Sequence, residues 1–264
     1  MAWVTKNSQE TYAPEPAAPE LTKKQKAANW WHYEKWVVLG VVAAVGIAAW
    51  IIKDTMFRPR PDYQVGVVAA SSLPVDLNAA LQSALQTYGE DINGDGRVLV
   101  QINEFVLDFN ADAEPADTEQ DEDAMRSAVS AYDQMAGVTR LSADLGSGTG
   151  SYLFLLEDPA GFQADTGALQ YTDGTVDDPD NPAGDWENMV YRWQDCPVLA
   201  GLDLGSYTGE TLLDDQTGSG QAYMNRFYVA RRGVWDPKQA GNFKGGAALW
   251  DALTAGATPL EPRP

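Results

Sequence analysis

The stretch that decides the architecture of this chain is an apolar run near the N-terminus, Trp36-Val-Val-Leu-Gly-Val-Val-Ala-Ala-Val-Gly-Ile-Ala-Ala-Trp-Ile-Ile52. As an α-helix rising about 1.5 Å per residue, these 17 residues extend roughly 26 Å, close to the ~30 Å hydrocarbon thickness of a bilayer. Lys35 and Lys53 flank the run, and their long side chains can place the ammonium groups at the two membrane surfaces. The run therefore predicts one transmembrane helix over residues 36–53.

A cleaved signal peptide is the alternative interpretation of this run. The apolar core of a signal peptide usually spans 7–15 residues and ends at a cleavage site of small residues. Here 35 residues precede the run, and it ends in Trp50-Ile-Ile-Lys53 without such a site. We therefore expect an uncleaved anchor in the cell membrane, with the N-terminus cytoplasmic and the C-terminal domain extracellular.

The flanking sequences predict how the rest of the chain is organised. Residues 1–22 are rich in Pro, Ala, Glu and Thr, which predicts a disordered cytoplasmic tail, and residues 23–35 predict a juxtamembrane helix continuous with the span. Two prolines, Pro59 and Pro61, cannot continue a helix, so residues 54–62 are expected to form a short stalk. The extracytoplasmic domain then covers residues 63–264.

The charge and cysteine content of that domain exclude several functions. Residues 62–264 contain 33 acidic but only 10 basic residues, an excess of 23 negative charges. Such a surface disfavours binding to nucleic acid or to anionic lipid. Cys196 is the only cysteine, so no intramolecular disulfide forms, and the domain has no histidine to activate it as a nucleophile. We expect Cys196 to be a packed core residue and the protein not to be an enzyme.

The apolar pattern of the domain predicts an α/β fold with a mainly parallel sheet flanked by helices. The domain is expected to begin with a strand-helix-strand unit, which consists of a buried strand at 63–70, a helix from Pro74 to Gly89 and a second strand at 98–107. The segments expected after this unit are an acidic loop at 111–123, a helix through Met135, a short helical piece at 141–145, a strand at 151–156, an acidic loop at 173–185, a strand at 222–230 and a helix at 246–255.

The loop Glu90-Asp-Ile-Asn-Gly-Asp-Gly-Arg97 carries a spacing typical of calcium sites. Asp91, Asn93 and Asp95 supply oxygen atoms at alternate positions, Gly96 permits the sharp turn, and Arg97 can add its carbonyl oxygen. This spacing resembles calcium loops of the EF-hand and dockerin type. It departs from them at the twelfth position, where Ile102 replaces the acidic ligand, so a turn that needs no ion is the alternative interpretation.

Two groups of residues are candidates for ligand binding. Glu157 and Asp158 directly follow a predicted strand, at the sheet edge where α/β proteins commonly bind ligands. Trp186 and Trp193, together with Tyr191 and Trp235, can line a pocket, although aromatic side chains more often pack in the core.

Four segments carry a resemblance to known proteins. Together they resemble a family of single-pass membrane proteins of Gram-positive bacteria that has no assigned activity. The four segments are the sequence from Asn29 through the span, the Tyr88–Gly96 loop, Gln134–Leu145 and Phe154–Gln163. Residues 63–163 also resemble the first lobe of extracellular solute-binding proteins. The lipid-attachment cysteine of those proteins is absent here, and only about 100 residues remain for a second lobe.

Two classes of function follow from these observations. The first is a membrane-anchored extracytoplasmic binding or accessory module for a small solute or a neighbouring surface protein, with a purely structural surface interaction protein as a variant. The second is a cell-surface hydrolase that uses carboxylates. The absence of a nucleophile motif favours the first class.

Overall fold

The computed structural model describes residues 22–56, 60–109, 121–178, 183–210 and 215–260. The chain divides into two compact units, Met1–Arg58 and Pro59–Pro264. The predicted tail at 1–22 and the acidic loop at 111–123 lie largely outside the described residues.

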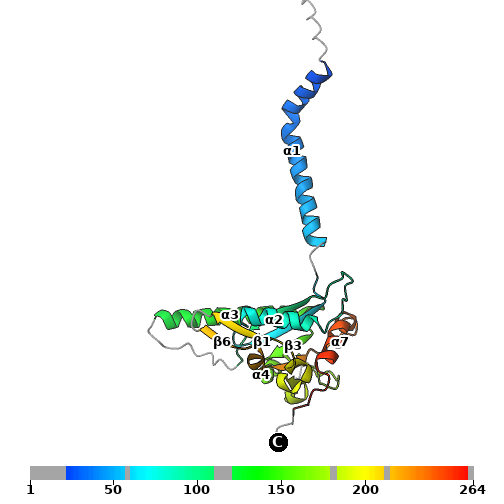
Figure 1. Cartoon of the computed structure of the whole chain (residues 1–264). Coiled ribbons are helices and arrows are strands. Elements are labelled where there is room, and N and C mark those ends of the chain that lie inside the picture. The colour runs from blue at the N-terminus through cyan, green and yellow to red at the C-terminus, as the bar shows by residue number, and fades with distance from the viewer. Residues whose placement is uncertain (1–21, 57–59, 110–120, 179–182, 211–214, 261–264) are drawn as a thin grey trace, which may run out of the picture. The chain divides into compact units, whose positions relative to one another are not determined.

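Over its described residues 22–56, the first unit forms the helix α1, which runs from Lys23 to Met56 (Figure 1). The juxtamembrane and apolar segments expected from the sequence are therefore one continuous helix. Its section Lys23–Lys53 is long and apolar enough to cross a membrane, and no side chain in its apolar window is buried. A signal sequence near the N-terminus can contain such a helix too. A membrane anchor differs from a signal sequence in that the mature protein keeps the helix.

The second unit is built on a five-stranded sheet with the order β2-β1-β3-β7-β4. Its strands are β1 (Tyr63–Ala69), β2 (Val100–Val106), β3 (Leu153–Leu156), β4 (Val190–Arg192) and β7 (Tyr228–Arg231). The pairs β1–β2 and β1–β3 are parallel, whereas β7 pairs antiparallel with both β3 and β4. The predicted α/β class is confirmed, and the sheet is parallel in its first three strands.

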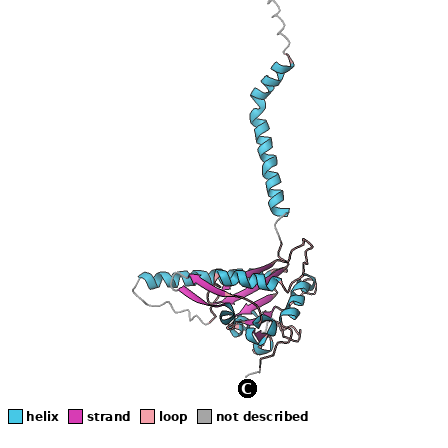
Figure 2. Cartoon of the chain, in the orientation of Figure 1, coloured by secondary structure: helices cyan, strands magenta, loops and turns pink. Residues whose placement is uncertain are grey.

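Helices cover both faces of this sheet (Figure 2). On one face, α2 (Val75–Gln86) and α7 (Lys244–Leu253) bury their leucines against alternate residues of β1 and β3, such as Val65 and Leu155. On the other face, Leu141 of α3 (Asp121–Gly146) and Phe162 of α4 (Pro159–Thr166) pack against the intervening residues, such as Phe154. The period of two along each strand thus divides the core into two layers.

Several short elements complete the unit. They are the 3-10 turns η1 (Trp186–Asn188), η2 (Trp193–Asp195) and η3 (Ala240–Phe243), the helices α5 (Pro197–Ala200) and α6 (Gly220–Met224), and the hairpin of β5 (Ser206–Glu210) and β6 (Asp215–Ser219). The hairpin contacts α2, and the Thr208 hydroxyl donates to Asp76 at 3.0 Å.

Arg232 ties the end of β7 to the end of α3. Its side chain is 4% exposed and donates to the carbonyl oxygens of Asp144, Leu145 and Ser147. Burial lowers the pKa of this guanidinium, while the opposite charge of Asp144 acts to raise it. The carbonyl groups at the C-terminus of a helix lack partners within the helix and favour a nearby cation, so Arg232 fixes where α3 ends.

One predicted strand was wrong. Residues 222–230 do not form one extended segment, because α6 ends at Met224 and β7 begins only at Tyr228. Met224 and Phe227 are both fully buried in the same core layer, and the Phe227 amide donates to the Met224 carbonyl across a turn. A strand would point residues three apart to opposite faces, so the burial of both side chains requires the turn.

The two helical pieces expected near 125–145 are a single helix, α3. Gly137 lies within this helix, against the end of β2. A methyl group built on Gly137 would lie 2.3 Å from the carbonyl oxygen of Val106. Glycine is therefore required here for close helix–strand contact, and the helix continues through it.

We predict that Gly137→Ala destabilises the second unit by about 1–3 kcal/mol, because the added methyl group meets backbone that cannot move aside cheaply. In an exposed helix the same change would stabilise by roughly 0.5–1 kcal/mol. Gly146→Ala is the matched control, since a methyl group at that position has no heavy atom within 4 Å. Urea unfolding curves of the two variants would contradict the prediction if Gly137→Ala were the more stable one.

Candidate functional site

The carboxyl ends of the parallel strands form the candidate site. From β1 the chain crosses to β2 on one side and then to β3 on the other, so the connections diverge between β1 and β3. Ligands of open α/β sheets bind in the crevice at such a switch point. Here the crevice, which we term the switch crevice, lies between the segment Ala70–Ser72 after β1 and Glu157 after β3.

A cavity of about 390 Å³ opens at this edge. The ends of all three parallel strands contribute to its wall, which is formed by Val68, Ala70, Leu107, Asp108, Phe109, Glu157 and Asp158. The Phe109 ring packs edge-on against Phe162 at 6.4 Å, so the apolar part of the wall continues into the core. The cavity thus combines an aromatic wall with carboxylates at its rim.

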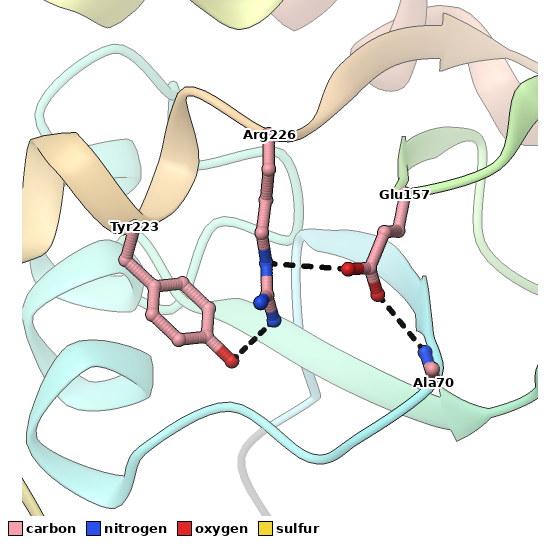
Figure 3. A network of polar contacts seen from close by, with 4 residues as sticks. All are labelled: Ala70, Glu157, Tyr223 and Arg226. Carbon is pink, nitrogen blue, oxygen red and sulfur yellow. Dashed lines mark hydrogen bonds and ion pairs between the residues drawn. The ribbon is translucent and has the colours of Figure 1, made fainter. Parts of the chain in front are cut away.

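Glu157 links β1 to β7 across the switch crevice (Figure 3). Its Oε2 accepts a hydrogen bond of 3.0 Å from the backbone N–H of Ala70. Its Oε1 lies 3.5 Å from Nε of Arg226, in the turn that precedes β7. The Glu157 carboxylate therefore joins the ends of three strands, β1, β3 and β7.

Arg226 is held mainly by aromatic side chains. Its guanidinium carbon lies 4.0 Å from the ring centroid of Tyr223 and 5.3 Å from that of Phe227, and Nη2 donates to the Tyr223 hydroxyl at 2.6 Å. Burial raises the pKa of the Tyr223 hydroxyl, with Arg226 and Ser71 acting in the opposite direction. The hydroxyl is therefore neutral at physiological pH and accepts from Arg226, with Ser71 of the β1 loop nearby.

Asp158, which the sequence analysis paired with Glu157 as a candidate for ligand binding, has a different structural role. Asp158 caps α4, and its Oδ1 accepts from the Gly161 backbone N–H at 3.0 Å. A carboxylate at a helix N-terminus satisfies an amide donor and interacts favourably with the helix dipole.

The aromatic candidates lie away from this edge cavity. Trp193 is fully buried, and its indole N–H donates to Gln221 at 2.8 Å. Trp186 packs edge-on against Tyr228, and Tyr191 lies against Trp250. Trp235 is 39% exposed and donates to the Asp177 carbonyl oxygen. The structure thus brings Glu157 and Asp158 to the switch crevice and accounts for the aromatic side chains by packing and hydrogen bonds.

Sequence reasoning missed Arg226, Tyr223 and the Ser71 hydroxyl. Arg226 fell inside the segment 222–230 that was expected to be a strand, and it was not a candidate residue there. The polar pair Asn225-Arg226 interrupts the apolar run between Met224 and Phe227 and was the available signal for a turn.

The loop at Asp91–Arg97 is organised by its own carboxylates. Asp91 Oδ1 accepts from the backbone N–H groups of Gly94 at 2.7 Å and Asp95 at 3.2 Å, and Oδ2 accepts from Gly96 at 2.7 Å. Asp95 Oδ1 accepts from the Arg97 amide, and Asn93 donates through its side chain to the Arg60 carbonyl. The same oxygen atoms that would bind calcium therefore also close an Asx-type turn.

Asp62 ties this loop to the start of β1. Its Oδ1 accepts from the backbone N–H groups of Ile92 and Asn93 at 3.0 Å each, and its Oδ2 accepts from Leu99 at 2.8 Å. Among the described residues, no three His, Cys, Asp or Glu side chains are arranged to hold a metal ion. Calcium binding by Asp91, Asn93, Asp95 and Arg97 stays a prediction.

Cys196 is fully buried, as the sequence suggested. Burial, together with the neighbouring Asp195, raises the pKa of its thiol to about 12. A thiol in this state is protonated and unreactive at neutral pH.

Searches among models of protein families, curated proteins and solved structures find no match to this chain. The resemblances noted in the sequence therefore stay predictions, and the geometry of the switch crevice is the basis for inferring a function.

We predict that Asp91→Asn destabilises the loop even without calcium, by about 1–2 kcal/mol, because asparagine has one acceptor oxygen for the amides that Asp91 binds with two. Asp95→Asn is the matched control, since its single bond from the Arg97 amide can be kept by the asparagine oxygen. Thermal unfolding in chelator would measure both effects.

The wild-type chain tests the calcium prediction. Adding several millimolar calcium should raise the melting temperature of the wild type if the ion binds the folded loop, and magnesium should raise it less. Equal stabilities of the two variants in chelator would contradict the turn assignment, and an unchanged wild type in calcium would contradict the ion.

Proposed function

We propose that the protein is a membrane-anchored extracytoplasmic binding module whose ligand occupies the switch crevice. The observation that carries this proposal is the cavity of about 390 Å³ at the point where the β1 and β3 connections diverge. Its wall is preformed by strand ends, and loops on such a scaffold commonly carry binding residues. The partner is a small solute, and calcium is at most an accessory ion of the separate Asp91–Arg97 loop.

The polar groups around the crevice support binding by fixed contacts. Ala70, Ser71 and Ser72 are exposed after β1, so the two serine hydroxyls and the backbone are accessible to a ligand. The Glu157 and Arg226 side chains are 30% and 39% exposed. Glu157 lines the cavity beside its apolar wall, and Arg226 lies directly behind it, with Nε 3.5 Å from Glu157 Oε1.

The charge of the chain supports the assignment to small solutes. The formal net charge is −20 at pH 7. Neutralising nucleic-acid phosphates requires a basic surface, whereas residues 62–264 contain 33 acidic and only 10 basic residues. A small solute needs only a few complementary groups, which the crevice supplies.

We predict that Ala70→Trp abolishes solute binding, because the indole fills the cavity that Ala70 lines. A metabolite library is screened by thermal shift against the full chain in detergent micelles. A ligand present at 100 times its Kd stabilises the folded state by about 2.7 kcal/mol, a readily measured shift.

Ala79→Trp is the matched control for this variant, since Ala79 is exposed on α2 and outside the cavity wall. Compounds that stabilise the wild type and Ala79→Trp, but not Ala70→Trp, would support the crevice. A library without any such compound, or hits that Ala70→Trp leaves unchanged, would overturn the proposal.

We also propose that the N-terminus is cytoplasmic and that the helix α1 is retained as the anchor. Epitope tags at both ends, followed by protease treatment of intact cells, test this topology. We predict that the C-terminal tag is lost while the N-terminal tag is protected. A full-length chain of 28.6 kDa in the membrane fraction is expected, whereas a shortened, released chain would indicate a cleaved signal sequence.

A further inference from the structure

We propose that the ligand of the switch crevice carries a carboxylate and that Arg226 binds this carboxylate. When no ligand is bound, the carboxylate of Glu157 pairs with Arg226 in its place. This inference rests on the proposed function and specifies its ligand class. It follows from the way in which the crevice already binds the carboxylate of Glu157 (Figure 3).

The donors around Glu157 form a carboxylate-binding pair. One carboxylate oxygen accepts from the Ala70 backbone N–H at 3.0 Å, and the other lies 3.5 Å from Nε of Arg226. A backbone amide and a guanidinium are the donors that recognise ligand carboxylates, because charge-assisted hydrogen bonds are stronger than neutral ones. The side chain of Glu157 thus stands where the carboxylate of a ligand would bind.

Arg226 keeps its position without Glu157. The guanidinium lies over the Tyr223 ring, approaches Phe227, and donates Nη2 to the Tyr223 hydroxyl at 2.6 Å. Tyr223 is itself held edge-on against Tyr207 at 5.2 Å. A planar guanidinium fixed in this way is preorganised, so little entropy is lost when it binds a carboxylate.

Glu157 is the replaceable member of the pair. The distance of 3.5 Å between Nε and Oε1 is long for a charge-assisted hydrogen bond, and both side chains are partly exposed. Exposed ion pairs of this kind contribute little to stability. The backbone of Glu157 stays anchored through its N–H, which donates to the Val68 carbonyl at 3.0 Å, while the side chain can rotate toward solvent.

The surroundings favour a carboxylate over a phosphate. Asp108 and Asp158 line the same cavity as Glu157. A phosphate group with its higher negative charge is repelled more strongly by these carboxylates than a singly charged carboxylate. The planar shape of a carboxylate also matches the two donors that now hold Glu157.

The test measures acetate binding to the full chain in detergent micelles by calorimetry, with phosphate at equal ionic strength as the comparison. Glu157→Gln removes the internal carboxylate, and with it the ion pair to Arg226, while it keeps a side chain of similar volume. We expect acetate to bind this variant at least about tenfold more tightly than the wild type, a difference of about 1.4 kcal/mol. Phosphate should show a smaller gain.

Two further variants control the experiment. Adding Arg226→Gln to Glu157→Gln should remove the gain, whereas adding Arg192→Gln, which changes an exposed arginine of β4, should leave it intact. If Glu157→Gln does not fold, the comparison of wild type with Arg226→Gln carries the test, and acetate should bind the latter more weakly.

Equal acetate affinity in the wild type and Glu157→Gln, acetate binding that survives Arg226→Gln, or a preference for phosphate would each overturn the inference. A separate result would identify failure of this inference alone: a solute whose binding is blocked by Ala70→Trp but unchanged by Glu157→Gln and Arg226→Gln. In that case the crevice remains the binding site and the carboxylate assignment is wrong.

Discussion

The burial of β1 on both faces is the constraint on which the rest of the domain depends. Val65, Val67 and Ala69 point into one core layer and Val68 into the other, so neither face of the strand can be left to water. A central parallel strand must therefore be covered by helices on both sides, and its neighbours must be reached by crossover connections. These crossovers place the carboxyl ends of β1, β2 and β3 at one edge, and this shared edge creates the switch crevice.

The antiparallel pairing of β7 changes what that edge contains. In a purely parallel sheet only loops that leave a strand lie at the carboxyl edge. Because β7 runs antiparallel to β3, the turn that enters β7 reaches the same edge and delivers Arg226 beside Glu157. A guanidinium thus comes to lie among the strand ends that carry Asp108, Glu157 and Asp158, and the sheet topology explains how groups of opposite charge meet there.

The sequence predicted those parts of the fold that are encoded by local periodicity. The leucines of α2, the apolar strand β1 and the alternating strand β2 were expected with boundaries close to those observed, because burial of one stripe or both faces leaves a clear pattern. Glu157 was a candidate for the same reason, since the end of an apolar strand is visible in sequence. Arg226 was not predicted, because its position depends on how Met224 and Phe227 are buried together, which is a property of the assembled core.

The excess negative charge of the domain is compatible with the anion site that we propose at Arg226. At physiological ionic strength the Debye length is about 8 Å, so most of the acidic residues are screened from a solute that has entered the crevice. The groups within that distance determine its binding, and there Arg226 is held by aromatic rings and a hydroxyl instead of by carboxylates alone. For the anionic solute that we propose, the acidic surface would act mainly on its approach, by lowering the association rate, whereas the geometry around Arg226 would govern which chemical group is retained.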